Sequence, residues 1–253
     1  EIKTEKLVEL NKLLKDRGIM IRHTKSLLKD TLPPKTRKPV ILPKPKGYQK
    51  ELNRLEAKYG ELAAPQLTMI RKWLAEEKVL DVTEYVQNII DQSETDKVLV
   101  FGNYKEATTK IGENLKVVAI NGDTKFEERQ PIIDKFQSDP NVKVLVMTVK
   151  TGNVGLNLVE ANHVVFNDYS YSPSDMMQAE ARIDRIGQTK PVTIHYMSAE
   201  NTVDEDVIDL LTKKQNILNG IIDGTPYTYD EKGIQQSVLD KLNAMMKSQK
   251  IQK

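Results

Sequence analysis

The chain has 253 residues, of which 39% are hydrophobic, and this is enough for one large domain with a packed core. It contains no cysteine, which excludes disulfides and thiolate metal sites. No apolar run approaches the roughly 18 residues that a membrane span requires, so we expect no membrane-spanning helix. The net charge is +2, but residues 1–60 hold 16 Lys and Arg against 7 Asp and Glu. Such a basic excess suits a polyanion such as nucleic acid, and a solvated linker face would show the same excess.

The first residue and the histidines narrow the class of protein further. The sequence opens on Glu1 within a helix-like run and shows no secretory signal. We therefore expect an intracellular fragment of a longer protein, cytoplasmic in a prokaryote or virus and nuclear in a eukaryote. The three histidines, His23, His163 and His195, lie far apart in the sequence, so we expect no metal site.

The N-terminal part of the chain has helical spacing interrupted by prolines. Residues 1–32 show the pattern of one or two amphipathic helices. Five of the eleven prolines then fall within residues 33–45, which predicts an extended connector rather than a helix. Residues 47–59 and 65–93 return to helical spacing.

From residue 97 onward, short β-branched runs alternate with segments long enough for crossover helices. The runs are residues 98–101, 117–120, 142–147, 164–166 and 192–196. They are almost continuously apolar, which is typical of strands that are covered on both faces. This alternation predicts an α/β fold, a three-layer αβα sandwich around a mostly parallel sheet.

Several helix starts in this region carry a capping signal. The pattern is a hydroxyl residue three positions before an acidic one, and it occurs at Thr124 with Glu127, Ser172 with Asp175, and Thr202 with Glu205. Pro131 lies well inside the helix expected from Thr124, so we expect that helix to kink or to begin late.

Residues 172–188 contain the most informative pattern of polar side chains. We expect one helix that starts at Ser172 and ends at Gly187. Its apolar face would hold Met176, Ala179, Ile183 and Ile186. Gln178, Arg182 and Arg185 would share a second face, because they are spaced i, i+4 and i+7. Paired guanidiniums match phosphate oxygens, but a surface helix with scattered charges fits the spacing equally well.

A second stretch, residues 147–158, places Gly152 and Gly155 directly after a strand. Ligands bind at this end of parallel strands, and glycines let backbone N–H groups approach a phosphate. Two glycines after a strand are nevertheless common. The sequence has no phosphate-cradling G-x-x-x-x-G-K-[ST] and no acid closing an apolar strand. It also lacks the G-x-G-x-x-G of a dinucleotide-binding enzyme.

These stretches together resemble a known family. KVLVFGNY (97–104), residues 147–158, HVVFNDYSYSP (163–173) and QAEARIDRIGQ (178–188) resemble motifs IV, V, Va and VI of the SWI/SNF-type branch of superfamily 2 helicases. The last string keeps every letter of the family pattern Q-A-x-x-R-x-x-R-I-G-Q. IRHTKSLLKDTLPPK (21–35) resembles the segment that joins the two lobes of that family, and residues 76–104 resemble its annealing-helicase-like branch.

The resemblance implies the second RecA-like lobe of a DNA-stimulated ATPase that translocates on double-stranded or branched DNA. ATP with Mg²⁺ would be held mainly by an N-terminal RecA-like lobe, and this chain alone would be inactive. It also implies an inter-lobe helical and Pro-rich linker over residues 1–46, the lobe with its leading helices over 47–224, and a helical tail over 225–253.

The resemblance also assigns roles to single residues. Arg182 and Arg185 would be arginine fingers, and Gln178 would help to organise the cleft. The remaining assignments are Gly155 and Asn157 on the nucleotide side, and Asn103, Lys150 and Thr151 on the DNA backbone.

The chain departs from the family pattern at a few positions. Thr151 and Asn153 flank Gly152 where Ala and Gly are usual, and Tyr171-Ser172-Pro173 replaces Trp-Asn-Pro. His23 stands where an Arg is usual. These changes keep open a second hypothesis, a non-catalytic nucleic-acid-binding or protein-docking module with a RecA-like fold.

Overall fold

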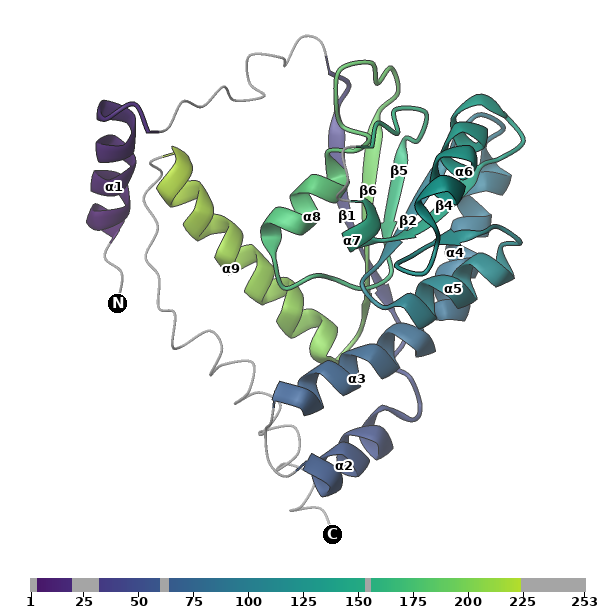
Figure 1. The fold of residues 1–253 in the computed structure, drawn as a ribbon. Helices are drawn as coiled ribbons and strands as arrows, with labels where there is room; N and C mark the ends of the chain where they lie inside the picture. The colour runs from purple at the N-terminus through teal and green to yellow at the C-terminus, as the bar shows by residue number, and fades with distance from the viewer. Residues whose placement is uncertain (1–3, 20–31, 60–63, 153–155, 224–253) are drawn as a thin grey trace.

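The computed structural model describes residues 4–19, 32–59, 64–152 and 156–223, and Figure 1 shows a sheet with helices on both faces. Six strands lie in the order β1-β6-β5-β2-β4-β3, and every neighbouring pair is parallel. The strands are β1 (Lys35–Leu42), β2 (Val98–Gly102), β3 (Ala119–Ile120), β4 (Val144–Thr148), β5 (His163–Phe166) and β6 (Val192–Ala199). The helices are α1 (Thr4–Asp16), α2 (Tyr48–Tyr59), α3 (Ala64–Glu77), α4 (Val79–Gln92), α5 (Lys105–Asn114), α6 (Phe126–Ser138), α7 (Val149–Gly152), α8 (Pro173–Glu180) and α9 (Val203–Asp223).

The central strands are buried on both faces. On β2, Leu99 and Phe101 belong to the core cluster that also contains residues of α6, α8 and α9. Val98 and Val100 point the other way, into the cluster formed with α4 and α5. All five residues of β2 and all five of β4 are buried, which explains why their sequences are continuously apolar. The predicted three-layer α/β sandwich is therefore confirmed.

The proline-rich segment is a strand of the sheet as well as an extended connector. β1 pairs with β6 at eight register positions, from Lys35 opposite Val192 to Leu42 opposite Ala199. Pro39 is accommodated because β1 lies at the edge of the sheet, where a missing N–H need not break a ladder. The extended backbone is confirmed, but the sequence did not predict that this part of the 1–46 linker joins the sheet.

Two of the three predicted caps are found in the structure. The Ser172 hydroxyl accepts a hydrogen bond from the Asp175 N–H at 3.3 Å, and Pro173 begins α8. The Thr202 hydroxyl accepts from the Asp204 N–H at 3.3 Å at the start of α9. Each cap satisfies a backbone donor that the helix itself leaves unpaired.

The cap predicted at Thr124 is wrong. Its hydroxyl accepts a hydrogen bond from the Asn121 N–H at 3.0 Å, within the turn that precedes the helix. α6 begins two residues later, at Phe126, and contains Pro131. A Thr hydroxyl can bond either to the backbone of a turn or to the backbone of a helix, and the Thr124 hydroxyl bonds to the turn.

The remaining elements pack around this sandwich. α2, α3 and the start of α9 share a third core cluster, and α1 contacts α9. None of the described helices is long and apolar enough to cross a membrane. Residues 21–31 of the predicted connector, including His23, and the predicted tail 225–253 lie outside the described residues.

Candidate functional site

The carboxyl ends of the parallel strands meet along one edge of the sheet, where ligands bind in open α/β folds. The loops after β2 and β5 are joined there, because the Asn103 N–H donates to the Asp168 Oδ1 at 2.5 Å. Asp168 is buried, and burial raises its pKa although the charge of Lys78 opposes the rise. Asn103 itself is half-buried. Its backbone N–H is engaged by Asp168, so the backbone of Asn103 has a structural role at this edge.

Lys150 and Thr151 follow β4 in the short helix α7, and their side chains differ in what they contact. The Thr151 hydroxyl lies 2.9 Å from the Thr148 carbonyl and 3.2 Å from the Ile120 carbonyl. It therefore holds the ends of β4 and β3 together. Lys150 is exposed to solvent on α7. Of these two predicted DNA-contacting residues, Lys150 is the one whose functional group faces outward.

Gly152 is required by close packing. A Cβ atom built at this position would lie 2.5 Å from the Phe101 Cε1 atom and 3.1 Å from the Met147 Sδ atom. No real Cβ approaches a ring so closely, and both neighbours belong to buried strands. Gly155 and Asn153, which the sequence singled out in the same loop, lie outside the described residues.

The predicted helix from Ser172 to Gly187 is shorter than expected. α8 ends at Glu180, and residues 181–187 form turns. The Arg182 carbonyl accepts from the Leu158 N–H at 3.0 Å, which takes the acceptor that a continuing helix would need. Ile186, predicted on the apolar face, is 72% exposed. The single helical face for Gln178, Arg182 and Arg185 is therefore wrong.

The turn nevertheless brings the two arginines together. Arg182 Nη1 and Arg185 Nη1 each donate to the Leu156 carbonyl at 3.3 Å. Burial, and after it the charge of Arg185, lower the pKa of Arg182, although a guanidinium remains protonated at neutral pH. Two cations beside a neutral carbonyl form a site that an anion would stabilise.

Gln178 and Asn157 are less closely tied to this pair. Gln178 is exposed on α8, and its Nε2 donates to the Ser174 hydroxyl at 3.3 Å. Asn157 has an exposed side chain and a carbonyl that accepts from Gln137 at 2.7 Å. Asn157 follows Leu156 directly, so it lies beside the acceptor that the two arginines share.

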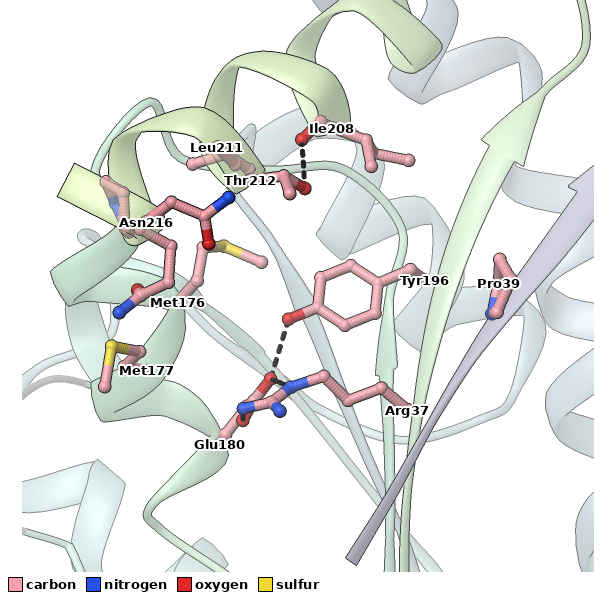
Figure 2. A pocket seen from close by; sticks show the side chains of 12 residues that line it. Arg37, Pro39, Met176, Met177, Glu180, Tyr196, Ile208, Leu211, Thr212 and Asn216 are labelled. Atoms are coloured by element: carbon pink, nitrogen blue, oxygen red, sulfur yellow. Dashed lines mark hydrogen bonds and ion pairs between the residues drawn. The ribbon is translucent and has the colours of Figure 1, made fainter. Parts of the chain in front are cut away.

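Glu180 and Asp184, the two acidic residues within residues 178–188, have partners that the sequence did not predict. Glu180 Oε1 and Oε2 accept from Arg37 at 2.8 and 2.6 Å, and Asp184 lies 2.7 Å from the Lys35 ammonium. Tyr196 also donates to Glu180, at 2.7 Å. Figure 2 shows Arg37, Glu180 and Tyr196 at a pocket of about 530 Å³ between α8, α9 and the β1 edge. The available signal was an acid at position 180, one helical turn after Met176 and next to Ala179 of the expected apolar face, because an acid buried there requires a cation.

Two histidines that are distant in sequence also meet. His163 Nδ1 lies 3.0 Å from His195 Nε2, and Tyr85 bonds to His195 Nδ1 at 2.9 Å. Neutral tautomers satisfy this chain if Tyr85 donates to His195 and His195 donates to His163. The described residues contain no group of three or more His, Asp or Glu that could hold a metal ion.

Comparison with known proteins gives consistent matches. The family model of the helicase conserved C-terminal domain matches residues 81–187. The Xenopus tropicalis SWI/SNF-related matrix-associated actin-dependent regulator of chromatin subfamily A-like protein 1 is 34% identical over 222 residues, covering 82% of this chain and 23% of the relative. The Mus musculus DNA annealing helicase and endonuclease ZRANB3 is 32% identical over 234 residues, covering 86% and 22%.

Solved structures share the fold. The C-terminal part of the Fun30 ATPase domain matches with a TM-score of 0.60 and 18% identity, covering 86% of this chain and 99% of that one. The Sulfolobus solfataricus SWI2/SNF2 ATPase core domain matches with a TM-score of 0.59 and 25% identity, covering 80% and 47%.

The parallel sheet and the arginine-bearing turn at its edge define a RecA-like lobe of the helicase type. The chain belongs to the SWI/SNF-type family of helicase superfamily 2. It corresponds to the C-terminal lobe of the proteins in that family. It spans about a quarter of the length of the curated relatives it matches.

Proposed function

We propose that this chain completes the ATPase site of a DNA-stimulated motor by supplying Arg182 and Arg185 to ATP held with Mg²⁺ on an N-terminal RecA-like lobe. The observation that carries the proposal is the convergence of both guanidiniums on the Leu156 carbonyl, at 3.3 Å each. The two positive charges repel each other, so a negatively charged phosphoryl group placed between them would be stabilised electrostatically.

The residues around the pair set its position. The Leu158 N–H donates to the Arg182 carbonyl at 3.0 Å, which ties Leu158 to the arginine turn. ATP with Mg²⁺ would supply the transferable phosphoryl group and neutralise part of its charge. Arg182 and Arg185 would stabilise the charge that grows on the equatorial oxygens. Gln178, Gly155 and Asn157 remain proposed neighbours of the nucleotide.

The DNA track is the second part of the proposal. Lys150, exposed at the carboxyl edge of the sheet, would contact duplex or branched DNA through phosphate, which gives affinity without reading sequence. Asn103 and Thr151 are the other residues proposed for the DNA track. Since the Thr151 hydroxyl is bonded to the protein, we assign it the support of the loop and Lys150 the contact.

The test joins this chain to an N-terminal ATPase lobe of its family and replaces each arginine with Ala. DNA-stimulated ATP hydrolysis should fall by roughly 10³-fold for Arg182→Ala or Arg185→Ala. Arg54→Ala is the matched control, because Arg54 is an exposed arginine paired with Glu51 on α2 and should leave the rate unchanged. Hydrolysis at the parent rate in both finger variants would reject the proposal. DNA binding without hydrolysis in the unaltered two-lobed protein would favour the non-catalytic module.

A further inference from the structure

Four charged side chains join the edge strand β1 to the arginine-bearing turn. Arg37 forms a two-pronged pair with Glu180, with Nε and Nη2 at 2.8 and 2.6 Å from the two carboxylate oxygens. Lys35 lies between the two acids, 3.4 Å from Glu180 and 2.7 Å from Asp184. Figure 2 shows the Arg37 and Glu180 side chains reaching toward each other from β1 and α8.

The acids are buried, whereas the cations reach solvent. The Glu180 and Asp184 side chains are 3% and 7% exposed, against 53% for Arg37. Burial acts to raise the pKa of Glu180, but the hydrogen bonds and charge of Arg37 outweigh it, so this pKa is lowered. A buried carboxylate that is ionised needs its cations in place, and the network therefore constrains geometry more than a surface pair does.

The positions of the two acids relate the network to the proposed chemistry. Glu180 is the last residue of α8, and Asp184 lies between Arg182 and Arg185. The turn is thus held on β1 at the helix residue that precedes it and at Asp184, near its centre. β1 begins at Lys35, the last residue of the segment 21–35 that the family resemblance assigns to the connection between lobes.

We propose that Lys35 and Arg37 are positioning residues for Arg182 and Arg185, so that β1 couples the inter-lobe connector to the proposed fingers. The inference rests on the proposed function of those arginines. Lys35 and Arg37 do not touch the nucleotide, and they act only through Glu180 and Asp184. Displacement of the turn by about 1 Å would lower the rate of phosphoryl transfer without changing the binding of ATP or DNA.

The test measures DNA-stimulated ATP hydrolysis in the same two-lobed protein. The double variant Lys35→Ala with Arg37→Ala should lose roughly 10- to 100-fold in kcat, with the KM for ATP and the affinity for DNA unchanged. Arg37→Lys keeps the charge but not the two-pronged contact, so it should recover only part of the rate. Arg54→Ala is the matched control, because Arg54 makes the same two-pronged contact with Glu51, at 2.7 and 2.5 Å, on α2.

The outcomes separate the two proposals. Unchanged kcat in the double variant, with activity lost in Arg185→Ala, would overturn the positioning role and leave the fingers intact. Full activity in Arg182→Ala and Arg185→Ala would reject the proposed function itself. If the double variant does not fold, Asp184→Asn decides the matter, since it removes the charge that pairs with Lys35 and keeps a side chain of the same size. A parent kcat for this variant, with normal melting, would likewise overturn the positioning role.

Discussion

Two pairs of cations meet at the arginine-bearing turn, one contacting it from β1 and one carried by it, and their surroundings differ. Lys35 and Arg37 on β1 are bonded to buried carboxylates, and the hydrogen bond to Glu180 raises the pKa of Arg37. Arg182 and Arg185 share one neutral carbonyl, and burial with mutual repulsion lowers the pKa of Arg182. The difference separates two uses of positive charge. A cation matched by an acid holds the fold together, whereas a cation beside another cation favours an incoming anion.

The largest predicted effect concerns a third matched cation, Lys78. Its ammonium is 1% exposed and lies 2.6 Å from Asp204, with the carbonyls of Asn167 and Met197 as further acceptors. Asp204→Ala leaves this charge buried without its acid, and should lower the free energy of unfolding by about 3–5 kcal/mol in urea titrations. Arg185→Ala, on an exposed side chain, should cost less than about 1 kcal/mol.

A double variant serves as the control for this prediction. Lys78→Met combined with Asp204→Ala removes both charges, so it should recover at least half of the lost stability. Equal losses in the single and double variants would show that Asp204 acts through packing and not through its charge. The stabilising role assigned to cations that are paired with buried acids would then lose its support.

The next prediction compares arginine with lysine at the two sites. Arg185→Lys keeps the charge but loses the planar fork that matches phosphate oxygens, so hydrolysis in the two-lobed protein should fall roughly 100-fold. Arg37→Lys also gives up a two-pronged contact, but with a buried carboxylate and not with the reacting phosphate, so it should cost less, about 3- to 10-fold. Steady-state rates at saturating ATP and DNA measure both. Similar losses at the two positions would erase the distinction.

A smaller effect is expected from a group whose charge the fold excludes. His195 is 4% exposed, and burial, followed by the charges of His163 and Lys38, lowers its pKa to about 3. The unfolded chain binds this proton near pH 6.5, so the contribution to stability is complete above that pH and is lost as pH falls toward 3. At pH 5 the loss should be about 2 kcal/mol.

Unfolding titrations between pH 5 and 8 measure this effect, and His195→Gln provides the comparison. The variant should show a flatter dependence on pH over that range, because it has no proton to bind. The pKa of His163 is also lowered by burial, which leaves a residual slope of the same sign. An unchanged slope in His195→Gln would contradict the assignment.

The smallest effect concerns DNA binding by exposed lysines. Lys150→Ala should lower the affinity of this chain for duplex DNA and reduce the slope of log affinity against log salt by about 1. Lys105→Ala is the control, since the Lys105 ammonium is already paired with Asp123 and should change the slope less. Equal slopes in the parent and in Lys150→Ala would remove Lys150 from the proposed DNA track.

Local patterns in the sequence were sufficient for the strands and for some helix starts. The five apolar runs from residue 98 onward all correspond to strands, and the caps at Ser172 and Thr202 are in place. These features depend on neighbouring residues alone. β1 was missed as a strand of the sheet because its partner β6 lies more than 150 residues away.

The candidate site shows the same division. The sequence identified Arg182 and Arg185 as a pair, and the structure brings them to one acceptor. The prediction from the sequence placed both arginines on one face of a continuous helix. That helix does not continue, because α8 ends at Glu180 and the Leu158 N–H donates to the Arg182 carbonyl. Spacing along a chain cannot show a hydrogen bond from another loop.

By itself the sequence predicted the layered α/β fold, the family, and Arg182 and Arg185 as candidate site residues. Each of these depends on residue type and local order. Only the tertiary structure decided which cations are matched by acids. Glu180 and Asp184 are 143 or more residues from their partners on β1, and burial of these carboxylates makes the pairing obligatory. Long-range burial of the two acids is what joins Lys35 and Arg37 to the turn that carries Arg182 and Arg185.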